Sequence, residues 1–177
     1  MSTTVQEPSS NVSTLILGGA RSGKSRYASA LALEMSPTPV LVATAQPLDA
    51  EMAERIALHQ RDRSAAWTTL ECPLDVVAAL TELSEDQTVV VDCLTLWLSN
   101  LMHQAKDVTD ETQRLCDYVQ TSRRRLIFVS NEVGLGLVPE TPLGRSFRDA
   151  QGRLNQALAA VADEVYFVAA GLPLQLK

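Results

Sequence analysis

The stretch TLILGGARSGKSRYASALALEM, from Thr14 to Met35, predicts a strand, a glycine-rich turn and a helix in direct succession. Its first five residues form a short apolar run that ends in glycine, which is typical of a buried strand. The octet GGARSGKS, Gly18 to Ser25, satisfies the pattern G-x-x-x-x-G-K-[S/T]. In the order strand, glycine-rich turn, helix, this pattern indicates a loop that binds phosphate.

Each residue type in the octet has a chemical reason. Glycines let backbone N–H groups approach phosphate oxygens without an intervening Cβ. Lys24 supplies a positive charge near the β and γ phosphates, Ser25 offers a hydroxyl to Mg²⁺, and the helix that follows presents its positive end to the anion. A glycine turn with an incidental lysine is the alternative, and the strand and helix around the octet favour the loop. The candidate nucleotide-binding residues here are Gly18, Gly19, Ala20, Arg21, Ser22, Gly23, Lys24 and Ser25.

Short apolar runs alternate with helical patterns along the rest of the chain. The runs lack polar alternation, which favours a parallel sheet covered by helices on both faces, and LPLQLK at the end of the chain predicts an antiparallel edge. We therefore expect an α/β fold of the P-loop NTPase class. Predicted strands cover 14–18, 40–45, 88–93, 126–131 and 164–170, and predicted helices cover 24–34, 49–63, 74–83, 94–104, 110–124 and 146–160.

The bulk properties limit the functional classes. The 177 residues favour one domain over 13–177, preceded by a polar tail over 1–12 that we expect to be flexible. A net charge of −6 argues against nucleic-acid binding. Three unpaired cysteines, no secretory signal pattern and no apolar run of membrane-spanning length predict a cytoplasmic protein without a membrane span.

Two carboxylates follow predicted strands. Asp92 ends the run VVVDC, where a carboxylate can hold Mg²⁺ directly or through water, and Glu132 follows the run LIFVSN. Asp92 could instead cap the helix that begins at Leu94. Its position beside a phosphate loop favours the metal role, so Ser25 and Asp92 form the predicted metal site.

His59 lies in the predicted helix DAEMAERIALHQRDR. Arg55, His59 and Arg63 recur at intervals of four residues and so share one face of a helix. From spacing alone, a solvated helix with ordinary charge pairs is the better interpretation. The alternative is a nucleophile: a neutral imidazole can attack phosphorus while neighbouring arginines hold the phosphates.

Four segments resemble the bifunctional adenosylcobinamide kinase and adenosylcobinamide-phosphate guanylyltransferase family of cobalamin biosynthesis. They are GGARSGKSRYA, VATAQPLDAEMAERIALHQRDR, DCLTLWLSNL and the block VSNEVGLGLVPETPLGRSFRDAQGRLNQALAAVADEVYFVAAGLPLQLK. The likeness runs from about Thr14 to Lys177. The phosphate loop is shared with many families, whereas the histidine segment and the last block are more specific.

The resemblance implies a RecA-like, trimeric enzyme with two reactions. ATP or GTP first phosphorylates adenosylcobinamide, and GTP then donates GMP through a guanylylated histidine, which gives adenosylcobinamide-GDP and pyrophosphate. His59 and Lys24 would be catalytic, and Mg²⁺ would accompany the nucleotide. The implied nucleotide contacts beyond the loop are Ala43, Thr44, Ala45, Gln60, Arg61, Asp62, Arg63, Glu71 and Asp92.

Two other functions stay open at this stage. The first is a plain phosphate-loop kinase, in which His59 is only structural. The second is a RecA-like nucleotide switch that binds a macromolecule, although the acidic net charge argues against it. The glycine- and proline-rich segment NEVGLGLVPETPLG, from Asn131 to Gly144, is long for a connection, and we expect it to shape the corrinoid or nucleotide site.

Overall fold

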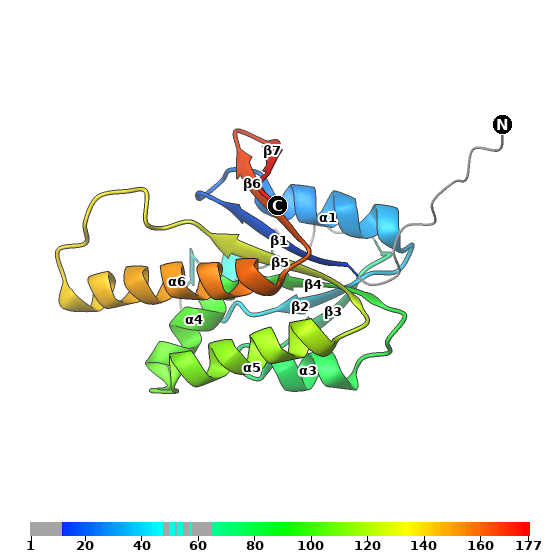
Figure 1. Cartoon of the computed structure of the whole chain (residues 1–177), viewed down its shortest axis with the longest axis horizontal. Helices are drawn as coiled ribbons and strands as arrows, with labels where there is room; N and C mark the ends of the chain where they lie inside the picture. The colour runs from blue at the N-terminus through cyan, green and yellow to red at the C-terminus, as the bar shows by residue number, and fades with distance from the viewer. Residues whose placement is uncertain (1–11, 48–49, 52, 55–56, 58–64) are drawn as a thin grey trace.

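The computed structural model of the chain describes residues 12–47, 50–51, 53–54, 57 and 65–177 (Figure 1). Its strands form one sheet in the order β3-β2-β4-β5-β1-β6-β7. All neighbouring pairs are parallel except β6 and β7, which are antiparallel. The strands are β1 (Ser13–Gly18), β2 (Val40–Ala43), β3 (Thr68–Glu71), β4 (Thr88–Asp92), β5 (Arg125–Asn131), β6 (Glu164–Ala169) and β7 (Leu172–Gln175).

Helices cover both faces of the sheet, as predicted. On β1, Leu15 and Leu17 pack into the larger apolar cluster, whereas Ile16 packs into the smaller one on the opposite face. This alternation is the period-two geometry of a strand buried on both sides. Among the described helices, α1 lies on the smaller cluster, and the other four lie on the larger one (Figure 1). The helices are α1 (Lys24–Met35), α3 (Val76–Glu82), α4 (Leu94–His103), α5 (Val108–Thr121) and α6 (Pro142–Val161).

The strand β3 was missed in the sequence. Its residues TTLE contain two threonines and a glutamate, and only Leu70 is partly buried. An exposed edge strand of four residues has no apolar run for a pattern to detect. Its place beside β2 nevertheless matters, because it brings Glu71 to the same end of the sheet as β2 and β4.

Several predicted boundaries were also wrong. Helix α6 begins at Pro142 rather than at 146, because Thr141 caps it by accepting a hydrogen bond from the Gly144 amide at 3.1 Å. Helix α5 begins at Val108 rather than at 110, since the Asp107 carboxylate accepts bonds from the amides of Thr109 and Asp110. Most of the helix predicted over 49–63 lies outside the described residues.

Candidate nucleotide-binding site

The glycine-rich loop joins β1 to α1 at the carboxyl end of the parallel strands (Figure 1). Gly23 is the residue before α1 and has a φ of 98°, a conformation that glycine adopts without strain. Arg21 also lies in the left-handed region, with a φ of 57°. The amide of Ser22 donates to the Gly19 carbonyl at 3.2 Å, and the amide of Gly171 donates to the Ser22 carbonyl at 2.7 Å. The loop is thus folded on itself and attached to the turn between β6 and β7.

Gly18 and Gly19 differ in the space around them. A Cβ on Gly18 would lie 2.5 Å from the Ser22 hydroxyl oxygen and 2.6 Å from the Val168 carbonyl oxygen. A Cβ on Gly19 would meet nothing within 4 Å. Gly18 is therefore required by packing, whereas the open side of Gly19 is accessible to a ligand such as a phosphate.

Lys24 is the first residue of α1 and is 8% exposed. Its ammonium donates a hydrogen bond of 3.0 Å to the Gly19 carbonyl. Burial lowers the pKa of Lys24, and the nearby Cys93 and Asp92 side chains partly oppose that shift. The charge interaction with Asp92 places the predicted lysine and the predicted metal-binding carboxylate in one electrostatic environment.

Three predicted nucleotide contacts form one row across the sheet. Ala43 of β2 is the register partner of Glu71 on β3 and of Asp92 on β4. Side chains at register partners of parallel strands point to the same face. Ala43 packs against the smaller cluster, so Glu71 and Asp92 also point toward the face that carries α1 and Lys24.

Asp92 does not cap α4. The residue before α4 is Cys93, and no side chain makes a capping bond there. This excludes the purely structural alternative for Asp92 and leaves its carboxylate available at the end of β4. The Thr95 hydroxyl of the same helix is occupied, since it accepts a 2.8 Å bond from the Asn131 amide at the end of β5.

Thr44, a predicted nucleotide contact, is fully buried and ties two strand ends together. Its hydroxyl donates to the Cys93 carbonyl at 2.7 Å and accepts from the Cys93 amide at 2.9 Å. The Asn100 side-chain amide donates to the Thr44 carbonyl at 2.8 Å and to the Pro73 carbonyl at 2.9 Å. The side chain of Thr44 is therefore occupied in joining the chain after β2 to the chain after β4. The half-buried Ala45 beside it would be the residue nearer to a ligand.

The end of β5 is held by a buried polar network that sequence reasoning missed. The Ser130 hydroxyl donates to Asn155 Oδ1 at 2.7 Å, and Asn155 Nδ2 donates to the Asn131 carbonyl at 3.1 Å. Gln151 Nε2 donates to both Ser130 Oγ and Asn155 Oδ1. Polar residues on the buried face of an otherwise amphipathic helix were the available signal.

The segment after β5 is anchored beside the loop. The Glu132 amide donates to the Gly18 carbonyl at 3.0 Å, so β5 ends directly beside the phosphate loop. The Glu132 carboxylate accepts a 2.6 Å bond from the Gly134 amide. Arg145, in the first turn of α6, donates to the carbonyls of Pro139 and Glu140 at the end of the segment.

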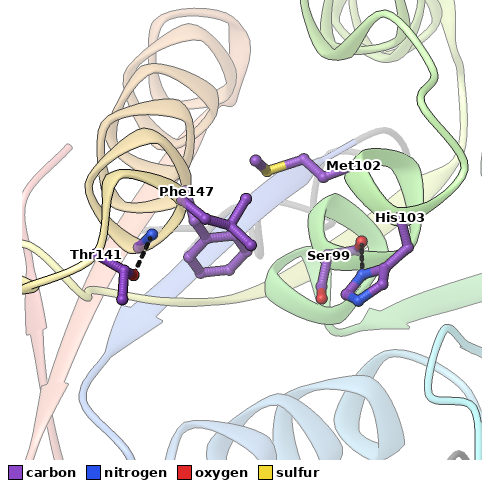
Figure 2. Close-up of a pocket in the computed structure, with 7 residues that line it drawn as sticks. Ser99, Met102, His103, Thr141 and Phe147 are labelled. Atoms are coloured by element: carbon purple, nitrogen blue, oxygen red, sulfur yellow. Dashed lines mark hydrogen bonds between the residues drawn. The ribbon is translucent and has the colours of Figure 1, made fainter.

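A pocket of about 400 Å³ lies between the end of α4 and the start of α6 (Figure 2). Ser99, Met102 and His103 line it from α4, and His103 is exposed at the helix end. Figure 2 shows Phe147 of α6 between Thr141 and the α4 side chains. The remaining lining residues are Leu143 and Gly144.

The donor atoms suit Mg²⁺ only in combination with a nucleotide. Within the described ranges, no group of three or more histidine, cysteine, aspartate or glutamate side chains is placed to hold a metal ion. Ser25 and Asp92 offer a hydroxyl and a carboxylate, the hard oxygen ligands that Mg²⁺ prefers, and phosphate oxygens complete such sites. The two residues therefore fit a metal that arrives with its nucleotide.

The remaining predicted site residues cannot be placed. His59, Gln60, Arg61, Asp62 and Arg63 lie outside the described residues. The structure brings together the loop residues Gly18–Ser25 with Ala43, Thr44, Ala45, Glu71 and Asp92 at one end of the sheet.

The fold and the loop define a P-loop nucleotide-binding protein of the α/β class. The sequence profile of the family described as cobinamide kinase / cobinamide phosphate guanyltransferase matches residues 14–176. The chain belongs to this family.

The alignments with three relatives cover nearly the whole length of both proteins. The bifunctional adenosylcobalamin biosynthesis protein CobP of Pseudomonas aeruginosa is 46% identical over an alignment of 166 positions that covers 92% of this chain and 96% of the relative. The bifunctional adenosylcobalamin biosynthesis protein CobU of Salmonella typhimurium is 40% identical over an alignment of 179 positions that covers 92% of this chain and 98% of the relative. The CobU protein of Escherichia coli is 38% identical with the same coverage.

A solved structure resembles the fold alone. A protein of Pyrococcus horikoshii OT3 matches with a TM-score of 0.52 at 12% identity, over 94% of this chain and 86% of that chain. No helix in the part of the chain that the structure describes has the length and hydrophobicity needed to cross a bilayer.

Proposed function

We propose that this chain phosphorylates adenosylcobinamide with ATP or GTP and then transfers GMP from GTP to the new phosphate. The products of the second step are adenosylcobinamide-GDP and pyrophosphate. The observation that carries this proposal is the family match over residues 14–176, which includes the glycine-rich loop and the segments around it.

The loop supplies the groups for the kinase step. Backbone amides near Gly19 and the Lys24 ammonium would bind the β and γ phosphates, and Lys24 would offset charge that develops on the transferred group. Ser25 and Asp92 would hold Mg²⁺, which neutralises phosphate charge when it is bound. The acceptor hydroxyl attacks the γ-phosphorus, the bond to the β-phosphate oxygen breaks, and the nucleoside diphosphate leaves.

The guanylyl transfer is assigned to His59. The imidazole nitrogen attacks the α-phosphorus of GTP, the bond to the bridging β-phosphate oxygen breaks, and pyrophosphate leaves. A phosphate oxygen of the phosphorylated corrinoid then attacks the same phosphorus and releases the imidazole. Lys24 would bind the triphosphate in this step too, and Arg61 and Arg63 are assigned to phosphate contacts.

The nucleotide would lie across the row formed by Glu71, Ala43 and Asp92. Backbone groups at Ala43, Thr44 and Ala45 would face the nucleoside. The Glu71 carboxylate, an acceptor when ionised, suits the N–H edge of guanine or a ribose hydroxyl. Gln60 and Asp62 complete the proposed contacts by resemblance.

The oligomeric state and the cellular compartment are also part of the proposal. By family resemblance we propose a trimer, and the three leucines Leu172, Leu174 and Leu176, each more than half exposed at the open sheet edge, provide apolar surface for contacts between copies. Nucleoside triphosphates are cytoplasmic co-substrates, so we place the reactions in the cytoplasm.

Incubation with GTP labelled at the α-phosphate tests the nucleophile. We expect an acid-labile, base-stable adduct on the protein that is absent in His59→Ala. The chain has two histidines, so His103→Ala is the matched control, and it should still accept the label because this step needs only GTP. An adduct that persists in His59→Ala would refute the assignment.

The same experiment separates the alternatives. Transfer of the γ-phosphate to adenosylcobinamide without any protein adduct would identify a plain kinase. Salt-sensitive binding of single-stranded DNA without transfer to adenosylcobinamide would favour the nucleotide switch.

A further inference from the structure

We propose that the pocket between the end of α4 and the start of α6 binds the corrin ring of the acceptor substrate. This inference rests on the proposed function and specifies where its larger substrate lies. Helix α4 follows β4 and Asp92, and α6 follows the segment that leaves β5 beside the phosphate loop. Helix α4 thus begins two positions after Asp92, and α6 is joined to the end of β5 by residues 132–141.

The distance between the pocket and the start of α4 suits an acceptor whose reactive group lies on a side arm. A helix of ten residues spans about 15 Å, so the far end of α4 lies roughly that far along the helix from its start beside Asp92. The phosphate-accepting hydroxyl of adenosylcobinamide is carried on an aminopropanol arm, away from the ring. A ring held at the far end of α4 can therefore direct its arm toward the phosphate loop without entering the loop.

The chemistry of the lining does not favour a phosphate group. None of the seven lining residues carries a carboxylate, an ammonium or a guanidinium group. A phosphate would find no cation there, whereas Lys24 provides one in the loop. Met102, Leu143 and Phe147 offer apolar surface to the methyl-bearing edge of a corrin, and sulfur and aromatic groups adapt well to such irregular ligands.

Polar groups at the rim match the amide side chains of a corrin. The His103 ring nitrogen Nδ1 lies 2.8 Å from the Ser99 carbonyl oxygen. A carbonyl oxygen only accepts, so Nδ1 is the donor in this contact and Nε2 is not used in it. This nitrogen is available to a corrin carboxamide, in the few-polar-groups pattern of small-molecule sites.

The segment that leads into the pocket has an unusual amount of exposed apolar surface. Leu137 is 95% exposed, Leu135 is 79% exposed and Val138 is 65% exposed. The segment continues through Thr141 to Leu143, which is 67% exposed and lines the pocket. A bulky, partly apolar substrate in the pocket would cover the part of this surface that Leu143 contributes, which water otherwise contacts.

Steady-state kinetics of the full chain test the proposal. We expect Leu143→Ser and Phe147→Leu to raise the KM for adenosylcobinamide about tenfold, the scale of losing part of one buried apolar side chain. The KM for the nucleotide should change less than about twofold. Leu33→Ser, an exposed leucine on α1, is the matched control and should leave both values unchanged. Because Leu143 is exposed, its substitution should not unfold the protein.

Equilibrium dialysis with adenosylcobinamide and no nucleotide provides a second measurement, since the corrin is detected by its own visible absorbance. A corrinoid that lacks the aminopropanol arm should compete with adenosylcobinamide but not with the nucleotide. Unchanged corrinoid affinity in both variants overturns the proposal, as does dissociation of an oligomer by Leu143→Ser with loss of activity. Failure of the unmodified protein to phosphorylate adenosylcobinamide would instead reject the proposed function.

Discussion

The Lys24 ammonium donates a hydrogen bond of 3.0 Å to the carbonyl of Gly19, five residues earlier in the same loop. The lysine therefore stabilises the loop internally while its pKa is lowered by burial. Nucleotide binding would provide this buried cation with phosphate oxygens in place of a single carbonyl. We propose that this contact is the state from which phosphate recognition starts.

We expect Lys24→Met to reduce both phosphoryl and guanylyl transfer about 100-fold or more, because the variant lacks the charge that offsets the transferred group. The free energy of unfolding should change little, because the loss of the hydrogen bond to Gly19 is offset by the removal of an ammonium whose charged form is disfavoured by burial. Product assays and urea unfolding measure the two effects. Normal rates in this variant would show that the loop is not the site.

Adjacent glycines should respond differently to the same substitution. Gly18→Ala would place a methyl group 2.6 Å from the Val168 carbonyl oxygen, and we expect a loss of about 1–3 kcal/mol of unfolding free energy. The methyl group of Gly19→Ala would have no atom within 4 Å. The free energy of unfolding of this variant should therefore lie within about 0.5 kcal/mol of that of the unmodified protein. Its effect should appear as a higher KM for the nucleotide. Equal stability losses would contradict the geometry of the loop.

The Cys93 thiol should make stability depend on alkaline pH. Burial raises its pKa from 9.0 to about 11. The unfolded chain therefore loses this proton at lower pH than the folded chain, and stability falls as pH rises through that window. For this group alone the loss between pH 8 and pH 10 is about 1 kcal/mol.

Urea unfolding of Cys93→Ala at these two pH values checks the prediction. The variant keeps the backbone groups that bond Thr44, and its stability should fall by less than that of the unmodified protein. Comparing the two proteins cancels the contributions of the titrating groups that do not interact with Cys93. Parallel losses would show that the Cys93 thiol does not titrate in this way.

Asn100 should matter more than its position in a helix suggests. Its amide bridges the carbonyls of Thr44 and Pro73, so Asn100→Leu leaves two carbonyls without their partner and should cost about 2–3 kcal/mol. Because Thr44 lies in the proposed nucleotide site, the KM for the nucleotide should also rise. Gln113→Leu on the exposed face of α5 is the control and should cost less than about 0.5 kcal/mol. Thermal unfolding and kinetics together would reveal whether the two effects are linked.

The sequence alone determined the apolar strands that are buried on both faces of the sheet, the described helices between them and the loop from Gly18 to Ser25. These features have local causes: apolar runs, helical spacing and glycine at a turn before lysine. It also identified the family through motifs in their order along the chain, and the family match confirms that identification.

Only the tertiary structure decided how separate segments combine. One row contains Glu71, Ala43 and Asp92 because β3 and β4 pair with β2 in a particular register. The threonine-rich sequence of β3 does not by itself predict that pairing. The Thr44–Asn100 contact joins residues 56 positions apart, and the pocket forms where two helices end and begin. Such long-range relationships depend on packing of the whole sheet and its helices, so no short window of sequence contains them.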